Sequence, residues 1–206
     1  MAQLLYVEAS PLKPRSHSIH VASEFLKAYG EINRQDEIEV IDLWQTKLPP
    51  FDGETIEAKF AVIRNQEFTP EQQARWDAVR AVSRRFNAAA KYVISVPMWN
   101  FSIPYPLKHY IDVVTLAGEN WSWSPEEGYR SLLSGKKALM IYASAGHYGP
   151  GDPSDFQKPY LRRWLNFIGI TDIHEINVAP TLTTNDMLAR IKCNAKAVAL
   201  ELAAGF

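Results

Sequence analysis

The chain has little cysteine, no long apolar run and no excess of charge of either sign. Its 206 residues include one cysteine, Cys193, so no internal disulfide can form, as is typical of a reducing compartment. No apolar stretch approaches the roughly 20 residues that span a bilayer, and no signal peptide precedes the first apolar run. We therefore expect a cytoplasmic protein without a membrane partner. With 22 basic and 23 acidic residues, the net charge of −1 offers no basic surface for nucleic acid.

Several motifs of nucleotide-binding and hydrolytic enzymes are also missing. No GxGxxG follows a strand and there is no GxxxxGK(S/T), so the dinucleotide and triphosphate cradles are both absent. A serine hydrolase would need a GxSxG elbow, which the sequence does not contain. A phosphorylated receiver domain would need clustered acids after the first strand and an Asp after the third. Glu8 stands alone there, and Pro97-Met98 occupies the other place.

The hydrophobic pattern alternates between strands and helices along the whole chain, with no linker or repeat. This order predicts one α/β domain over residues 1–206, with a doubly wound sheet of five parallel strands. The predicted strands are Leu4–Val7, Glu37–Leu43, Lys91–Val96, Lys136–Ala143 and Thr171–Val178. The predicted helices are one capped by Ser16, then Pro70–Ala90, Tyr105–Leu116, Phe156–Gly169 and Thr184–Ala203.

Two further segments are predicted to lie outside this alternation. Trp44–Thr69 is expected to be polar and irregular, because it carries Pro49-Pro50 and shows no clear period. Trp121–Pro125 alternates aromatic and serine residues, which suggests one arm of a β-hairpin.

The loop after the third strand, Pro97–Ser102, is the most informative segment. Open parallel sheets bind ligands outside the carboxyl ends of their strands. Met98, Trp99 and Phe101 offer apolar and aromatic surface to a flat ligand, while Asn100 and the backbone N–H groups offer hydrogen bonds to its edge. A pocket is the interpretation we favour, although an aromatic plug that closes the sheet would show the same composition.

The loop after the first strand is rich in hydroxyl groups and ends at a helix N-terminus. Free backbone N–H groups and the helix dipole favour an anion there. Ser16 and Ser18 can add hydroxyl donors, and Arg15 or His17 can add charge. This composition suits a monophosphate, and an ordinary serine N-cap would explain it as well.

The loop after the fourth strand contains three glycines within six residues, which lets the backbone approach a ligand closely. Ser144 and His147 add polar groups, and His147 can donate a proton or a hydrogen bond. A solvated surface loop would have the same sequence. In a flavodoxin-like strand order, however, these three loops meet where the order reverses. Together they outline a site for flavin mononucleotide (FMN).

The three loops resemble those of the FMN-dependent NADH-azoreductases, also described as NADH:quinone oxidoreductases, which have a flavodoxin-like fold. The resemblance covers essentially the whole chain, and its middle motif is the specific one. The matching motifs are Ser-Pro…Arg-Ser-His-Ser at 10–18, Pro-Met-Trp-Asn-Phe-Ser-Ile-Pro…Leu-Lys…Tyr-Ile-Asp at 97–112, Ser-Ala-Gly-His-Tyr at 144–148 and Tyr-Leu-Arg-Arg-Trp-Leu-Asn-Phe-Ile-Gly-Ile at 160–170. It implies a five-stranded parallel sheet with helices on both faces.

The resemblance also implies which residues contact the cofactor. The FMN phosphate would be held by Ser10, Ser16, His17 and Ser18. The isoalloxazine ring and ribityl chain would be lined by Met98, Trp99, Asn100 and Phe101. The pyrimidine side of the ring would contact Ser144, Ala145, Gly146 and His147. Trp99 stands where the family commonly has Tyr. Ala145 stands where it commonly has Arg, so a fixed positive charge beside the flavin is missing.

The function that the resemblance implies is transfer of two electrons from NADH, through FMN, to quinones and azo compounds. Donor and acceptor would use one apolar slot in turn, which predicts ping-pong kinetics, and no side chain is assigned as a catalytic acid or base. Family members are homodimers with sites at the subunit interface, where Trp44–Thr69 and Trp121–Trp123 would fit. The alternative is a flavodoxin-type electron carrier that does not oxidise NADH itself, which the near-zero net charge and the chain length disfavour.

Overall fold

A five-stranded parallel sheet forms the centre of the computed structural model, which describes residues 1–64, 66–67 and 69–206. The strand order is β2-β1-β3-β6-β7, the flavodoxin-like order, in which the sequence of strands reverses between β1 and β3. The strands are β1 (Gln3–Glu8), β2 (Glu37–Asp42), β3 (Lys91–Pro97), β6 (Lys137–Ala143) and β7 (Asp172–Val178). The predicted strands and the doubly wound fold are confirmed.

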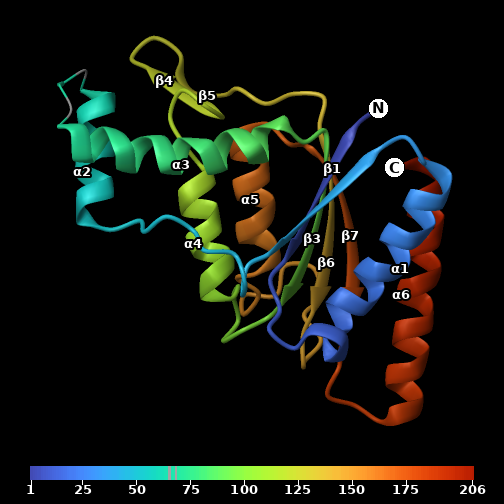
Figure 1. Cartoon of the computed structure of the whole chain (residues 1–206). Coiled ribbons are helices and arrows are strands. Elements are labelled where there is room, and N and C mark those ends of the chain that lie inside the picture. The colour runs from blue at the N-terminus through green and yellow to red at the C-terminus, as the bar shows by residue number, and fades with distance from the viewer. Residues whose placement is uncertain (65, 68) are drawn as a thin grey trace.

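Helices cover both faces of the sheet (Figure 1). One face is covered by α1 (His17–Ile32) and α6 (Asn185–Gly205). The other is covered by α3 (Pro70–Ala88), α4 (Tyr105–Val114) and α5 (Lys158–Ile168). Successive strand residues point to opposite faces, so Leu4 and Tyr6 join the α1 and α6 core, while Leu5 and Val7 join the other. Because both faces are covered, β1, β3 and β6 are almost continuously apolar.

The prediction of an irregular stretch over Trp44–Thr69 is wrong for part of that range. Helix α2 (Gly53–Ile63) lies within it and begins where the Asp52 carboxylate accepts the Thr55 N–H at 3.1 Å. Helix α2 packs through Ala58 against α3 and not against the sheet. The apolar pattern of α2 is therefore short and predicts a helix only weakly. Residues 65 and 68 of the predicted stretch lie outside the described residues.

The predicted hairpin is confirmed by the antiparallel pair β4 (Trp121–Ser124) and β5 (Gly128–Ser131). It stands out from the body of the molecule (Figure 1), and its base packs on α5, where the Trp121 and Phe167 ring centroids lie 5.6 Å apart. After the hairpin the chain passes under the end of α5, where Gly169 has a φ of +100°. A β-carbon at this glycine would lie 2.0 Å from the Leu133 carbonyl oxygen, so only glycine fits the predicted left-handed cap.

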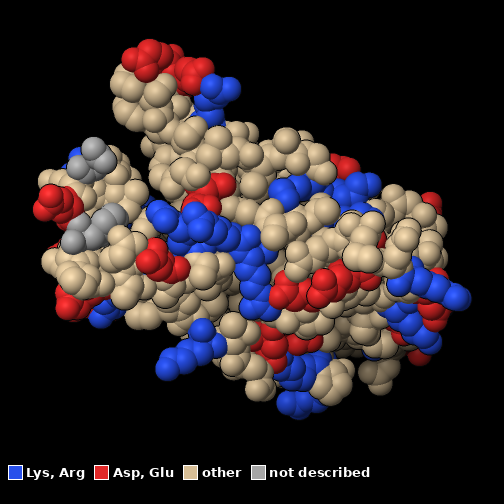
Figure 2. Space-filling model, turned by 45° about the horizontal axis from the view of Figure 1, so that its top comes forward, with Lys and Arg blue, Asp and Glu red and all other residues tan. Residues whose placement is uncertain are grey.

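Both ends of the chain lie at the edge of the sheet where the strands begin, which we call the amino edge (Figure 1). The Ala2 N–H donates to the Asp36 carboxylate at 2.7 Å, just before β2. The Phe206 ring packs edge-on against Phe25 with centroids 5.2 Å apart. In the described ranges no helix is both long enough and apolar enough to cross a membrane. Acidic and basic side chains are intermixed on the face shown in Figure 2.

Candidate functional site

The three loops singled out in the sequence meet at the opposite edge of the sheet, the carboxyl edge, because they follow three neighbouring strands. The Ala9 N–H after β1 donates to the Ser95 carbonyl of β3 at 3.1 Å. The Met98 N–H after β3 donates to the Ala143 carbonyl of β6 at 2.7 Å. The predicted convergence of the loops is therefore confirmed.

The first loop presents hydroxyl and amide groups at the start of α1. Ser16 caps the helix by accepting the Ile19 N–H at 3.4 Å, and its hydroxyl lies 3.2 Å from that of Ser18. The amides of His17 and Ser18 have no acceptor within the described part of the chain. Ser10, at the start of the same loop, is buried, and its hydroxyl accepts the Leu12 N–H at 3.4 Å. These groups form a cradle that a small anion fits.

His17 adds no positive charge of its own to this cradle. Burial, with the nearby Lys192 and His20, lowers the pKa of His17 below its usual value near 6.5. The imidazole is therefore neutral at pH 7, where one ring nitrogen donates a hydrogen bond and the other accepts one. A bound dianion would raise this pKa again.

An ion-pair network that sequence reasoning missed supports the first loop from beneath. Lys13, in the 3₁₀ turn Lys13–Arg15, has a φ of +52°, which is unusual for a residue with a side chain. Its ammonium group lies 3.1 Å from Glu8 and also pairs with Asp42. Partial burial lowers the pKa of Lys13, but the hydrogen bonds to Asp42 and Glu8 outweigh it and raise that pKa overall. Nothing in a single sequence pairs Lys13 with a residue at the end of β2.

The second loop is a tight turn held under strain. Trp99 and Ser102 exchange two backbone hydrogen bonds of 2.9 Å, which enclose Asn100 and Phe101 as a two-residue turn. Both enclosed residues have positive φ, 46° and 69°, as in the turn type that favours Asn-Gly. A phenylalanine in this conformation costs about 1–2 kcal/mol.

The same turn exposes groups that a ligand could use. The amides of Asn100 and Phe101 have no acceptor within the described residues, and the Phe101 ring is 52% exposed. Strained residues of this kind cluster at ligand sites. Free amides beside an exposed aromatic ring suit a flat ligand with polar edges.

The third loop is anchored at its start and open beyond it. Ser144 is buried, and its hydroxyl donates to the Gly146 carbonyl at 2.8 Å. The backbone of Ser144 and Ala145 accepts the N–H groups of Thr181 and Leu182 at 2.9 and 3.2 Å. The side chains of Ala145 and His147 are exposed at the rim.

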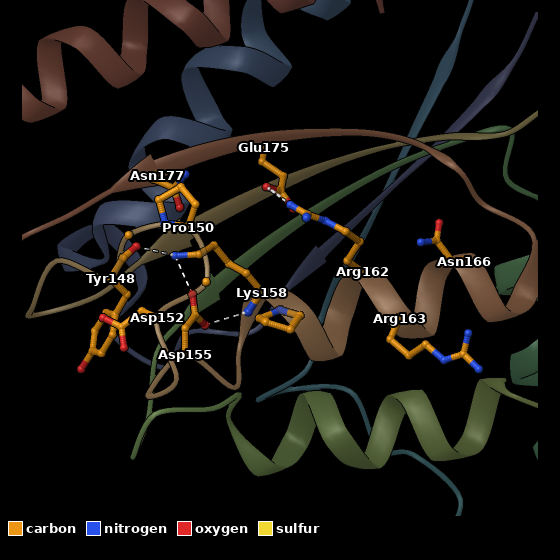
Figure 3. Close-up of a pocket in the computed structure, with 13 residues that line it drawn as sticks. Tyr148, Pro150, Asp152, Asp155, Lys158, Arg162, Arg163, Asn166, Glu175 and Asn177 are labelled. Carbon is orange, nitrogen blue, oxygen red and sulfur yellow. Dashed lines mark hydrogen bonds and ion pairs between the residues drawn. The ribbon is translucent and has the colours of Figure 1, made fainter.

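A pocket of about 510 Å³ lies on the outer side of the third loop, between Tyr148–Asp152, α5 and β7 (Figure 3). Its charged groups are largely paired: Lys158 with Asp155 and Arg162 with Glu175, each at 2.7 Å. The Asp155 carboxylate also accepts the N–H of Lys158 at 3.0 Å, so α5 begins there and not at the predicted Phe156. The pocket lining includes none of the predicted cofactor residues.

Comparison with known proteins gives matches over nearly the whole chain. A family model described as the flavodoxin-like fold matches residues 2–200. The FMN-dependent NADH:quinone oxidoreductase of Desulfotalea psychrophila is 41% identical over 205 residues, 98% of this chain and 97% of that protein. A protein of the same name from Nitratidesulfovibrio vulgaris is 42% identical over 195 residues, 93% of each chain.

The solved structures that resemble this chain include enzymes of the same kind as these relatives. An azoreductase from Bacillus anthracis superimposes with a TM-score of 0.91 at 25% identity, over 100% of both chains. An FMN-dependent NADH-azoreductase from Bacillus anthracis, in complex with FMN, gives a TM-score of 0.88 at 30% identity, over 98% of both chains. The resemblance noted in the sequence is confirmed, and the chain belongs to the flavodoxin-like family that includes the FMN-dependent NADH:quinone oxidoreductases.

Proposed function

We propose that this protein is an FMN-dependent oxidoreductase that takes two electrons from NADH and passes them to quinones and azo compounds. The observation that carries the proposal is the match to the named quinone oxidoreductases at 41% and 42% identity, which extends over all three loops. A flavodoxin-type carrier without its own NADH oxidation is the less favoured alternative.

The donor groups of the three loops fit FMN. In the proposed site, Ser10, Ser16, His17 and Ser18 hold the phosphate, and the free amides at the start of α1 add two donors. The turn of Met98, Trp99, Asn100 and Phe101 faces the ring with its free amides and aromatic surface. The wall beside the pyrimidine edge is formed by Ser144, Ala145, Gly146 and His147. When bound, FMN supplies the two-electron chemistry, and the protein orients it.

The residues around the slot bind flat partners and exclude water, and they do not act as acids or bases in this proposal. NADH and the acceptor are both flat, so the surface beside Phe101 takes them one after the other. Exposed His147 at the rim can donate a hydrogen bond to the acceptor. Alternating use of one slot gives parallel double-reciprocal lines, and intersecting lines would contradict it.

An anaerobic absorption experiment tests the proposal. The purified protein should show flavin bands, which bleach on addition of NADH and return when a benzoquinone is added. Flavin bands that NADH leaves unchanged would favour the carrier. A protein that stays colourless after incubation with FMN would contradict both functions.

We further propose a cytoplasmic homodimer with its sites near the subunit interface. A groove of about 320 Å³ lined by Ile103, Tyr105 and Tyr160 runs between α4 and α5 beside the second loop, and the hairpin exposes Trp123 and Tyr129. Exposed apolar and aromatic side chains of this kind mark protein interfaces, which supports the proposal. The free thiol of Cys193 suits a reducing compartment. Sedimentation of the FMN-loaded protein as a monomer would contradict the dimer.

A further inference from the structure

Trp44, on the segment that follows β2, contacts two of the three loops at once. Its indole N–H donates to the Ala9 carbonyl at 3.0 Å, directly before Ser10 of the first loop. The centroid of its ring lies 5.6 Å from that of Trp99, at the strained turn of the second loop, and 5.5 Å from that of Tyr105. One side chain thus joins the phosphate cradle to the aromatic turn.

The contacts of Trp44 are not those of an ordinary core tryptophan. It is half-buried and belongs to none of the three apolar clusters formed by the described residues. Trp164 of α5, in contrast, is buried in the core, where its indole N–H donates to the Thr115 hydroxyl at 2.9 Å. The ring and the indole N–H of Trp44 therefore contact the loops at the carboxyl edge and not the core.

The backbone of Trp44 is fixed by the same network that supports the first loop. Its N–H donates to the Asp42 carboxylate at 3.0 Å, and the other oxygen of that carboxylate pairs with Lys13. The Ala9 carbonyl that Trp44 engages belongs to a residue whose own N–H is bound to Ser95. The first loop is thus held from β2 and from β3, with little freedom to shift before a ligand arrives.

We infer that Trp44 is a positioning residue that holds the first and second loops in the geometry that binds FMN. The inference rests on the proposed function. Fixing the loops in advance lowers the ordering cost of binding, so Trp44 should act on the affinity for FMN. It should act little on turnover once the cofactor is bound, because the contacts of Trp44 are to the loops themselves.

The test compares Trp44→Phe and Trp44→Leu with Trp164→Phe as the matched control. Trp44→Phe keeps a ring beside Trp99 and loses the bond to Ala9, so the Kd for FMN should rise about fivefold. Trp44→Leu loses the ring contacts as well, and its Kd should rise at least about thirtyfold. The visible circular dichroism of the bound flavin should change in Trp44→Leu. Trp164→Phe loses an indole hydrogen bond of similar length and should leave the Kd unchanged.

FMN titration of the protein stripped of cofactor, together with kcat at saturating FMN and the melting temperature, separates the outcomes. A raised Kd with kcat within about twofold of wild type supports the inference. An unchanged Kd in both Trp44 variants overturns it, as does a rise in Trp164→Phe equal to that in Trp44→Phe. If the wild-type protein does not bind FMN, the proposed function fails and the inference fails with it. If Trp44→Leu does not fold, Trp44→Phe and its control decide.

Discussion

The two edges of the central sheet differ in how far their polar groups are paired. At the amino edge, polar side chains satisfy one another: the Tyr29 hydroxyl donates to Asp36 at 2.5 Å and accepts from Lys91 at 2.7 Å. Lys136 at the same edge donates to the carbonyls of Asn87 and Ala89, at 2.8 and 2.5 Å. Groups that would be costly to bury alone are paired there.

The carboxyl edge differs in its backbone strain and in its hydrogen-bonding groups that have no partner among the described residues. Every residue other than glycine that has a positive φ within the described ranges lies there, namely Lys13, Asn100 and Phe101. Amides without acceptors and exposed rings accompany these residues. The contrast suggests that the amino edge stabilises the fold, whereas the carboxyl edge stores the strain and unused hydrogen-bonding capacity that a ligand takes up.

The largest effect is expected at the phosphate cradle. Ser18→Ala removes a hydroxyl that we place against a doubly charged phosphate, so the Kd for FMN should rise about 10- to 100-fold. The melting temperature without FMN should change little. Ser23→Ala is the control, because Ser23 lies five residues further along α1 and its hydroxyl donates to the His20 carbonyl. Equal loss of affinity in both variants would contradict the placement of the phosphate.

The next effect belongs to the amino edge. Tyr29→Phe removes a hydroxyl that donates to Asp36 and accepts from Lys91, so the free energy of unfolding should fall by about 1–2 kcal/mol. Urea denaturation measures this change, and FMN titration should give the wild-type Kd. A parallel loss of FMN affinity would show that the two edges are coupled, against the comparison drawn here.

Much of this contrast could be predicted from the sequence. The alternating pattern predicted the strands, and with them that the three loops would meet at one edge of the sheet. Which residues of these loops contact FMN is implied by the family resemblance and stays a prediction. Helix α2 was harder to predict, because it packs on α3 and has only a short stripe of apolar residues. The support of the first loop by Lys13 and Trp44 depends on contacts between residues about 30 positions apart, which one sequence does not reveal.

A smaller effect of opposite sign is expected at the strained turn. Phe101→Gly restores the Asn-Gly pair that this turn favours, so the protein should gain about 0.5–1 kcal/mol of stability. The apolar surface of the slot is lost, so the KM for quinones should rise. Gly135→Ala is the control, because Gly135 precedes β6 at the amino edge with a φ of +65°. It should lose stability and keep its KM, and a stability loss in Phe101→Gly would refute the assignment of strain.

The smallest effect is an acid sensitivity of the amino edge. Hydrogen bonds, first from Tyr29 and then from the Ala2 amide, lower the pKa of Asp36 from 3.8 to about 2. Its contribution to stability is therefore complete above about pH 4 and is lost as the pH falls from about 4 to about 2, since only the unfolded chain takes up the proton there. The melting temperature of the wild type should fall over this pH interval more steeply than that of Asp36→Asn. Equal slopes of melting temperature against pH would show that Asp36 does not contribute to stability in this way.

The placement of the two chain ends has a practical consequence. Met1 projects freely from the amino edge, and Phe206 is held there by Phe25 and Tyr29. A tag, a fused domain or a surface linker attached through the N-terminus would thus sit on the far side of the sheet from the three loops at the carboxyl edge. Molecules immobilised in this way on a bead or an electrode would present the carboxyl edge, with the proposed site, to the solution. Dye or quinone could reach every one of them without passing the support.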